Sequence, residues 1–91
     1  MIRRPLLVAN RLGLHARAAA KLVRLVGGFS SEVRLSHENQ NQHIDARSIL
    51  GILMMAASQG TRLIVTIDGS DEAEAGEAIR ELFENKFGEE N

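Results

Sequence analysis

The chain has 91 residues, a formal net charge of −1 and no cysteine, and 44 % of its residues are hydrophobic. This length predicts one domain over residues 1–91 with a small core, and the lack of cysteine excludes disulfides and thiol chemistry. The apolar stretch Leu6 to Ala9 is too short for a signal peptide, and the run Ile49 to Ala57 is too short to span a membrane. We therefore expect a cytoplasmic protein.

The spacing of apolar residues divides the chain into alternating strands and helices. The predicted elements are a strand over 2–9, a loop over 10–14, a helix over 16–26, strands over 32–36 and 41–44, a helix over 49 to about 57, a strand over 61–67 and a last helix from a cap at Ser70 or Asp71 to about Phe87. Asp71 and Glu74 have the spacing of a capping box, and residues 88–91 are expected to fray. The order β-α-β-β-α-β-α predicts an α+β fold in which helices cover one face of a sheet.

The segment Gly13 to Arg17 joins the first strand to the first helix. A helix start offers unpaired N–H groups and a partial positive charge, which suit an anion. A neutral imidazole is a nucleophile near pH 7, so His15 can accept a phosphoryl group that would lie near the backbone amides of Ala16 and Arg17. The Arg17 side chain can add a charge-assisted contact. The same pattern also fits a surface histidine beside a solvated arginine, and spacing alone favours that second interpretation.

Two motifs resemble those of the histidine-containing phosphocarrier (HPr) family of the bacterial phosphotransferase system. Asn10 to Arg17 is similar to the family's active-site motif, and Asp45 to Gly51 is similar to its regulatory-serine motif. Gln59 to Thr61 and Asp68 to Glu72 also fit, and the segment Leu82 to Glu90 is similar to the nitrogen-related branch. The resemblance implies an open-faced β-sandwich of four antiparallel strands covered on one face by three helices, which agrees with the predicted order of elements.

The resemblance also implies a function. His15 would accept a phosphoryl group from phosphorylated Enzyme I as a pros-phosphohistidine, and would pass it to an EIIA-type acceptor with the help of Arg17. The implied protein is a carrier rather than a stand-alone catalyst, acts as a monomer, and uses no cofactor, metal, nucleic acid or membrane insertion. The family usually has proline where this chain has Ala18, which keeps helix propensity but adds an N–H group.

The second motif supplies a candidate regulatory site and a candidate docking surface. Ser48 is a good helix N-cap, and it also matches the serine that a dedicated kinase, HPr kinase/phosphorylase, modifies in some members of the family. Ile49, Leu50 and Leu53 match the positions of the family's apolar docking patch. Periodicity alone would bury at least half of these three, with Ile52 and Met55 competing for the buried face. The candidate docking residues are Leu14, Lys21, Arg24, Arg47, Ile49, Leu50 and Leu53.

Two other functions compete with the carrier. The chain can be a regulatory interaction protein that docks through the helix after Ser48 and is switched by phosphorylation of that serine. RNA binding by the sheet is disfavoured because the predicted strands contain no aromatic residue to stack on a base. His37 and His43 lie in polar segments without partners at ligand spacing, so we interpret them as surface residues rather than metal ligands.

Overall fold

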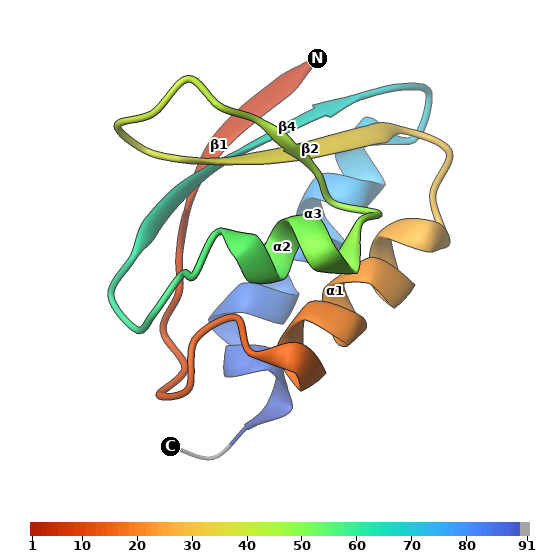
Figure 1. Ribbon diagram of the computed structural model, residues 1–91. Coiled ribbons are helices and arrows are strands. Elements are labelled where there is room, and N and C mark those ends of the chain that lie inside the picture. Colours follow the sequence, from red (N-terminus) through yellow and green to blue (C-terminus); the bar gives the residue numbers. More distant parts are fainter. Residues whose placement is uncertain (90–91) are drawn as a thin grey trace.

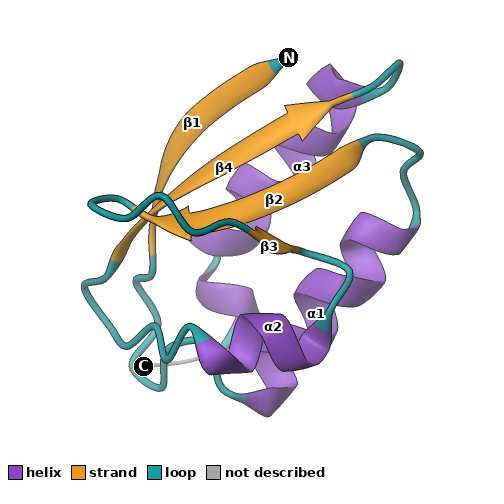
Figure 2. Ribbon diagram, turned by 45° about the horizontal axis from the view of Figure 1, so that its top comes forward, coloured by secondary structure: helices purple, strands orange, loops and turns teal. Residues whose placement is uncertain are grey.

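The computed structural model describes residues 1–89 as two layers, a four-stranded sheet and a layer of helices on one of its faces (Figure 1). The elements are β1 (Ile2–Leu7), α1 (Ala16–Gly27), β2 (Glu32–His37), β3 (Ile44–Asp45), α2 (Ile49–Met54), β4 (Arg62–Asp68), α3 (Glu72–Glu84) and the short 3-10 turn η1 (Lys86–Gly88). The predicted α+β fold with an open sheet face is confirmed (Figure 2).

The sheet has the order β1-β4-β2-β3, and all its pairs are antiparallel. β4 lies between β1 and β2, with Leu63 opposite Leu6 on one side and Val65 opposite Leu35 on the other. Pro5 lies in the edge strand β1, where its missing N–H group costs the sheet least. Buried residues alternate with more exposed ones along β4, so one face of the sheet lies against the helices.

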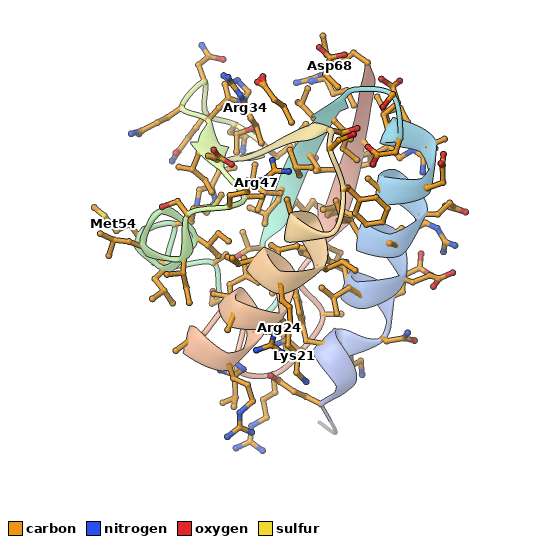
Figure 3. All side chains as sticks on the ribbon, turned by 90° about the vertical axis from the view of Figure 1, so that its right-hand side faces the viewer. Lys21, Arg24, Arg34, Arg47, Met54 and Asp68 are labelled. Atoms are coloured by element: carbon orange, nitrogen blue, oxygen red, sulfur yellow. The ribbon has the colours of Figure 1, made fainter. Side chains whose placement is uncertain are left out.

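The core lies between this face and the three helices. α1 contributes four buried side chains, Ala18, Ala19, Leu22 and Val26, at helical spacing. α3 contributes Phe83, whose ring packs against that of Phe87 with a centroid separation of 4.9 Å. The exposed Met54 points away from this core (Figure 3). Within the helix layer α1 packs against α2 and α3.

Several predicted boundaries are wrong because tertiary contacts override local pattern. β1 ends at Leu7 rather than residue 9, and β3 is Ile44–Asp45 rather than residues 41–44. α2 ends at Met54, and Ala56 then takes a φ of 51°, a left-handed conformation that no helix can continue through. α3 ends at Glu84, before the predicted end near Phe87.

The start of α3 also differs from the prediction, because Asp71 makes no side-chain cap. Its carboxylate instead accepts hydrogen bonds from the N–H of Ser30 at 2.9 Å and from the N–H of Ser31 at 3.0 Å. The side chain of Glu72 accepts from the N–H of Gly69 at 3.1 Å. Asp71 therefore ties the loop after α1 to the start of α3, and the capping box is not formed.

Candidate active site

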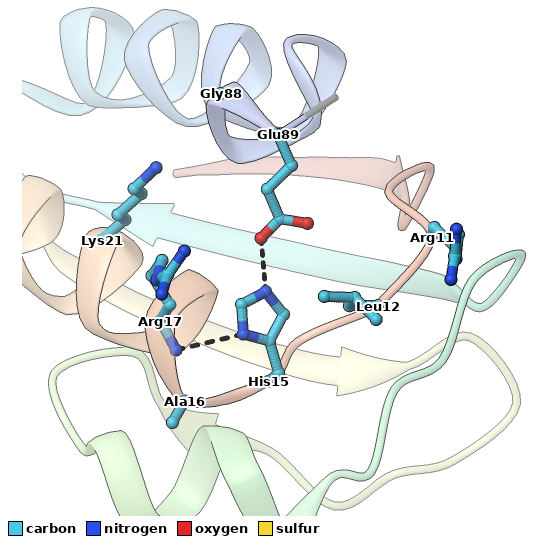
Figure 4. A pocket seen from close by; sticks show the side chains of 8 residues that line it. All are labelled: Arg11, Leu12, His15, Ala16, Arg17, Lys21, Gly88 and Glu89. Carbon is cyan, nitrogen blue, oxygen red and sulfur yellow. Dashed lines mark hydrogen bonds and ion pairs between the residues drawn. The ribbon is translucent and has the colours of Figure 1, made fainter. Parts of the chain in front are cut away.

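His15 is the N-cap of α1, with extended backbone angles of φ −74° and ψ 179°. Its Nδ1 accepts a hydrogen bond from the backbone N–H of Arg17 at 3.2 Å, and its carbonyl accepts one from Ala19 at 2.8 Å (Figure 4). The ring nitrogen thus takes the place of the side-chain oxygen that caps most helices. Nδ1 consequently lies where the helix start favours negative charge.

The second ring nitrogen of His15 contacts a carboxylate from the other end of the chain. Nε2 forms a hydrogen bond to one oxygen of the Glu89 carboxylate, and the other oxygen accepts from the side-chain amide of Asn10 at 3.0 Å. Because a carboxylate accepts and the Arg17 N–H donates, these contacts assign the proton to Nε2 and leave a lone pair on Nδ1. Burial raises the pKa of Glu89, but the hydrogen bonds from Asn10 and His15 outweigh this effect, so its pKa lies below the ordinary value.

Basic side chains surround this pair in an open hollow of about 900 Å³. The lining residues are Arg11, Leu12, His15, Ala16, Arg17, Lys21, Gly88 and Glu89 (Figure 4). Arg11 and Arg17 are exposed, and neither forms a salt bridge with the residues that the structure describes. Their charges are therefore available to an incoming anion, as is expected of a site for phosphoryl oxygens.

The loop before His15 is pressed against the segment after α2. Gly13 has a φ of 67°, and a Cβ there would lie 2.4 Å from the carbonyl oxygen of Ala57. The same oxygen accepts a hydrogen bond from Leu14 N–H at 2.9 Å. Leu14 is only 5 % exposed and belongs to the core. The prediction that Leu14 is a docking residue is wrong, because its side chain is buried in the core beneath the start of α1 and is not open to a partner.

α2 presents most of its apolar residues to solvent. Ile49, Leu50 and Leu53 are all exposed, with Leu50 at 65 %, whereas Ile52 is fully buried. The helix has only six residues, so a single side chain is enough to anchor it to the core. Met54, 77 % exposed, extends the same surface and was missed by sequence reasoning.

The predicted basic docking residues do not form one set. Arg24 is exposed, but Lys21 Nζ donates to the carbonyl of Phe87 at 2.6 Å. The Arg47 guanidinium donates to the carbonyls of Phe29 at 2.7 Å and Ser31 at 3.2 Å. Lys21 and Arg47 therefore hold segments of the fold together, and a partner that contacted either side chain would compete with these internal hydrogen bonds.

Ser48 is the N-cap of α2. Its Oγ accepts a hydrogen bond from the N–H of Gly51 at 3.0 Å, which confirms the capping interpretation. The residue is nevertheless exposed, so the hydroxyl is open to a modifying enzyme.

The other two histidines lie away from the site. His37 is partly buried with Nε2 2.8 Å from the carbonyl oxygen of Met55, so its interpretation as a surface residue is wrong. His43 is exposed. Within residues 1–89, no three His, Asp or Glu side chains are grouped as metal ligands, and no helix is both long and apolar enough to cross a membrane.

The fold and the site define a class of protein. An unprotonated imidazole nitrogen at a helix start, in an open and basic hollow, can take a phosphoryl group from one partner and present it to another. The hollow is open to solvent rather than closed around a small molecule. These are the features of a small phosphoryl carrier protein.

Comparisons with known proteins give the family. The model described as "PTS HPr component phosphorylation site" matches residues 2–85. The chain is 49 % identical to the phosphocarrier protein HPr of Xylella fastidiosa, and 45 % identical to that of Cupriavidus necator, over 89 residues that cover 98 % of each chain. It also matches the crystal structure of an HPr from Thermoanaerobacter tengcongensis with a TM-score of 0.93 and 38 % identity, over 100 % of both chains. The chain belongs to the HPr family, and it is a phosphocarrier of the phosphotransferase system.

Proposed function

We propose that His15 is the residue of this phosphocarrier that carries the phosphoryl group, on Nδ1. The observation that carries the proposal is the hydrogen bond from Arg17 N–H to Nδ1, because it assigns a lone pair to this nitrogen and places it at the start of α1. In the reaction the Nδ1 lone pair forms the N–P bond while the bond between phosphorus and the donor breaks, and its electron pair stays with the donor. Transfer to the acceptor reverses these steps.

The residues around Nδ1 suit the charge of the bound phosphoryl group. The N–H groups of Ala16 and Arg17 belong to the first turn of α1 and need no partner inside the helix. They are placed to donate to phosphoryl oxygens once the contact between Arg17 N–H and Nδ1 is given up. The Arg17 guanidinium adds a positive charge from the wall of the hollow.

HPr family membership implies interaction with Enzyme I and EIIA components. For this chain we propose phosphorylated Enzyme I as donor and an EIIA-type protein as acceptor, with the chain acting as a monomer in the cytoplasm. The exposed residues Ile49, Leu50, Leu53 and Met54 support docking through α2. A small exposed apolar surface of this kind is typical of a protein-binding face.

The assignment of His15 is tested by incubating the protein with phosphoenolpyruvate and a matching Enzyme I. We expect one acid-labile phosphate per chain in the parent and none in His15→Ala. His43→Ala is the matched control, because His43 is exposed and lies outside the hollow, and it should be labelled like the parent. Labelling of His15→Ala, or no labelling of the parent by a competent Enzyme I, would disprove the assignment.

A second candidate function is regulation through Ser48. The exposed hydroxyl sits at the start of α2, directly beside the exposed residues of the docking helix. A phosphate on Ser48 would place a double negative charge next to Ile49 and Leu50, which changes what partner can pack there. We propose that an HPr kinase/phosphorylase can use this serine.

Pull-down with Ser48→Asp and His15→Ala separates the two functions. A regulatory interaction protein predicts a partner that is retained by His15→Ala and lost by Ser48→Asp. Ser70→Asp is the control for an added charge, because Ser70 is exposed at the start of α3. Equal capture by Ser48→Asp and Ser70→Asp would rule out Ser48 as a switch.

A further inference from the structure

The C-terminal strap, defined as residues 86–89, crosses from α3 to the start of α1 (Figure 4). Lys86, Phe87 and Gly88 have φ values of 55°, 57° and 74°. Two of these residues carry a Cβ, for which the left-handed conformation is unfavourable. Contacts with the rest of the fold must therefore hold the strap in this path.

Two contacts provide that hold. The side chain of Phe87 is 1 % exposed and packs on Phe83 in the core. The carbonyl of Phe87 accepts the hydrogen bond from Lys21 of α1 at 2.6 Å. The strap is thus fixed to both helices immediately before Glu89, so the direction of the Glu89 side chain is set by the fold.

Asn10 fixes the far side of the Glu89 carboxylate. It is fully buried, and its side-chain nitrogen donates to the carbonyl of Gly13 at 2.7 Å as well as to Glu89. Both neighbours are acceptors, so only one orientation of the amide fits. Glu89 is thereby held between a rigid donor and the Nε2–H of His15.

We propose that Glu89 is a positioning residue for phosphoryl transfer, which keeps the proton on Nε2 of His15 and aims Nδ1 at the start of α1. The proposal rests on His15 being the phosphoryl acceptor. The net lowering of the pKa of Glu89 by Asn10 and His15, despite burial, agrees with a carboxylate that is charged at neutral pH.

The proton on Nε2 has a consequence for the reaction. When Nδ1 forms the N–P bond, the ring keeps its Nε2 proton and becomes positively charged, and Glu89 compensates this charge from the side opposite the phosphoryl group. When the N–P bond breaks on transfer, its electron pair returns to Nδ1 and the ring is again neutral with the proton on Nε2. No proton has to enter or leave the ring in either direction.

The test uses Glu89→Gln and Glu89→Ala, with Glu84→Gln as the control. Glu84 is an exposed acid of α3 that pairs with Arg80, away from the hollow, so its variant removes one charge without touching the strap. NMR of the 15N-labelled imidazole should show a slowly exchanging Nε2 proton in the parent and in Glu84→Gln. In both Glu89 variants this proton should exchange faster and a tautomer protonated on Nδ1 should appear.

Phosphorylation of His15 by phosphorylated Enzyme I should be slower by about tenfold in Glu89→Ala, which corresponds to one hydrogen bond to a charged group. Lys21→Met releases the strap but keeps Glu89. It should likewise speed the exchange of the Nε2 proton and bring out the tautomer protonated on Nδ1. Ring signals and transfer rates of Glu89→Ala that match those of Glu84→Gln would overturn the proposal, even if thermal stability fell. A phosphate located elsewhere than on His15 in the parent would instead overturn the proposed function on which it rests.

Discussion

The contact between Gly13 and Ala57 determines where the helix start carrying His15 lies, and Gly13→Ala tests it. Gly13 has a φ of 67°, and the added Cβ would lie 2.4 Å from Ala57 O and 2.9 Å from the Cα of Ser58. Both neighbours are backbone atoms, which cannot turn aside as a flexible side chain can. The loop has to move, and the hydrogen bond of 2.9 Å from Leu14 N–H to Ala57 O is strained or lost with it.

The expected cost has two parts. The left-handed conformation costs an alanine about 1–2 kcal/mol, and forcing an added carbon into a packed site costs about 1–3 kcal/mol more. Gly13→Ala should therefore lower the free energy of unfolding by about 2–5 kcal/mol, or Tm by about 8–40 °C for a domain of this size. Two other glycines separate the contributions, because a Cβ on Gly60 or Gly27 would meet nothing within 4 Å.

Thermal and urea unfolding of the three variants measures each part. Gly60 has a φ of 89°, so Gly60→Ala should show only the conformational cost of about 1–2 kcal/mol. Gly27 ends α1 without a positive φ, so Gly27→Ala should stabilise the protein by about 0.5–1 kcal/mol. Equal losses for Gly13→Ala and Gly60→Ala would refute the claim that contact with Ala57 positions the loop.

Three further predictions concern the core, the loop after α1 and the helix start. Ile52→Ala should lower the free energy of unfolding in urea by about 2–5 kcal/mol. Leu50→Ala should change it by less than about 0.5 kcal/mol and should weaken Enzyme I binding measured by calorimetry. Equal losses of stability in the two variants would contradict the assignment of Ile52 to the core. The Ser31 hydroxyl, followed by the N–H of Ser30, lowers the pKa of Asp71 below its ordinary value of 3.8, so the charged form stabilises the fold. The stability difference between the parent and Asp71→Asn should be full above pH 3.8 and decline as pH falls below it in urea titrations, and a pH-independent difference would contradict this. Ala18→Pro should keep the fold by circular dichroism and still be labelled, because the N–H it removes belongs to the unpaired first turn of α1; loss of labelling would show that this N–H is required.

The order of elements could be predicted because each carries its own periodic signal. β4 was expected over residues 61–67 and lies at Arg62–Asp68, since its alternation of apolar residues is local and strong. α1 was expected over residues 16–26 and lies at Ala16–Gly27. Its glycines mark its end without help from the rest of the fold.

The ends of α2 and α3 could not be predicted, because distant contacts determine them. α2 ends at Met54, shortly before Ala57, whose carbonyl accepts a hydrogen bond from Leu14, a residue far away in the sequence. α3 gives way to the left-handed turn at Lys86 because Phe87 has to reach the core. Such contacts leave no trace in the spacing of nearby residues.

The site also combines residues whose arrangement could be predicted with residues whose arrangement depends on distant contacts. His15 and Arg17 lie in one short motif, so their relation at a helix start could be predicted. Glu89 lies 74 residues from His15 and falls in a segment that composition assigned to a frayed end. Asn10 was within the motif, but its role depends on Glu89. The sequence offers one indication of this contact: Phe87, an aromatic residue of the kind found in cores, stands two positions before Glu89.

The chemistry of the carrier is tested most directly by locating the phosphorus on the ring. The protein is labelled with 15N-histidine, phosphorylated with phosphoenolpyruvate and Enzyme I, and studied by NMR for coupling between 31P and each ring nitrogen. The geometry at the start of α1 predicts a coupling to Nδ1 of His15, with the proton retained on Nε2. A coupling to Nε2, or to a ring nitrogen of His37 or His43, would contradict the assignment of the site.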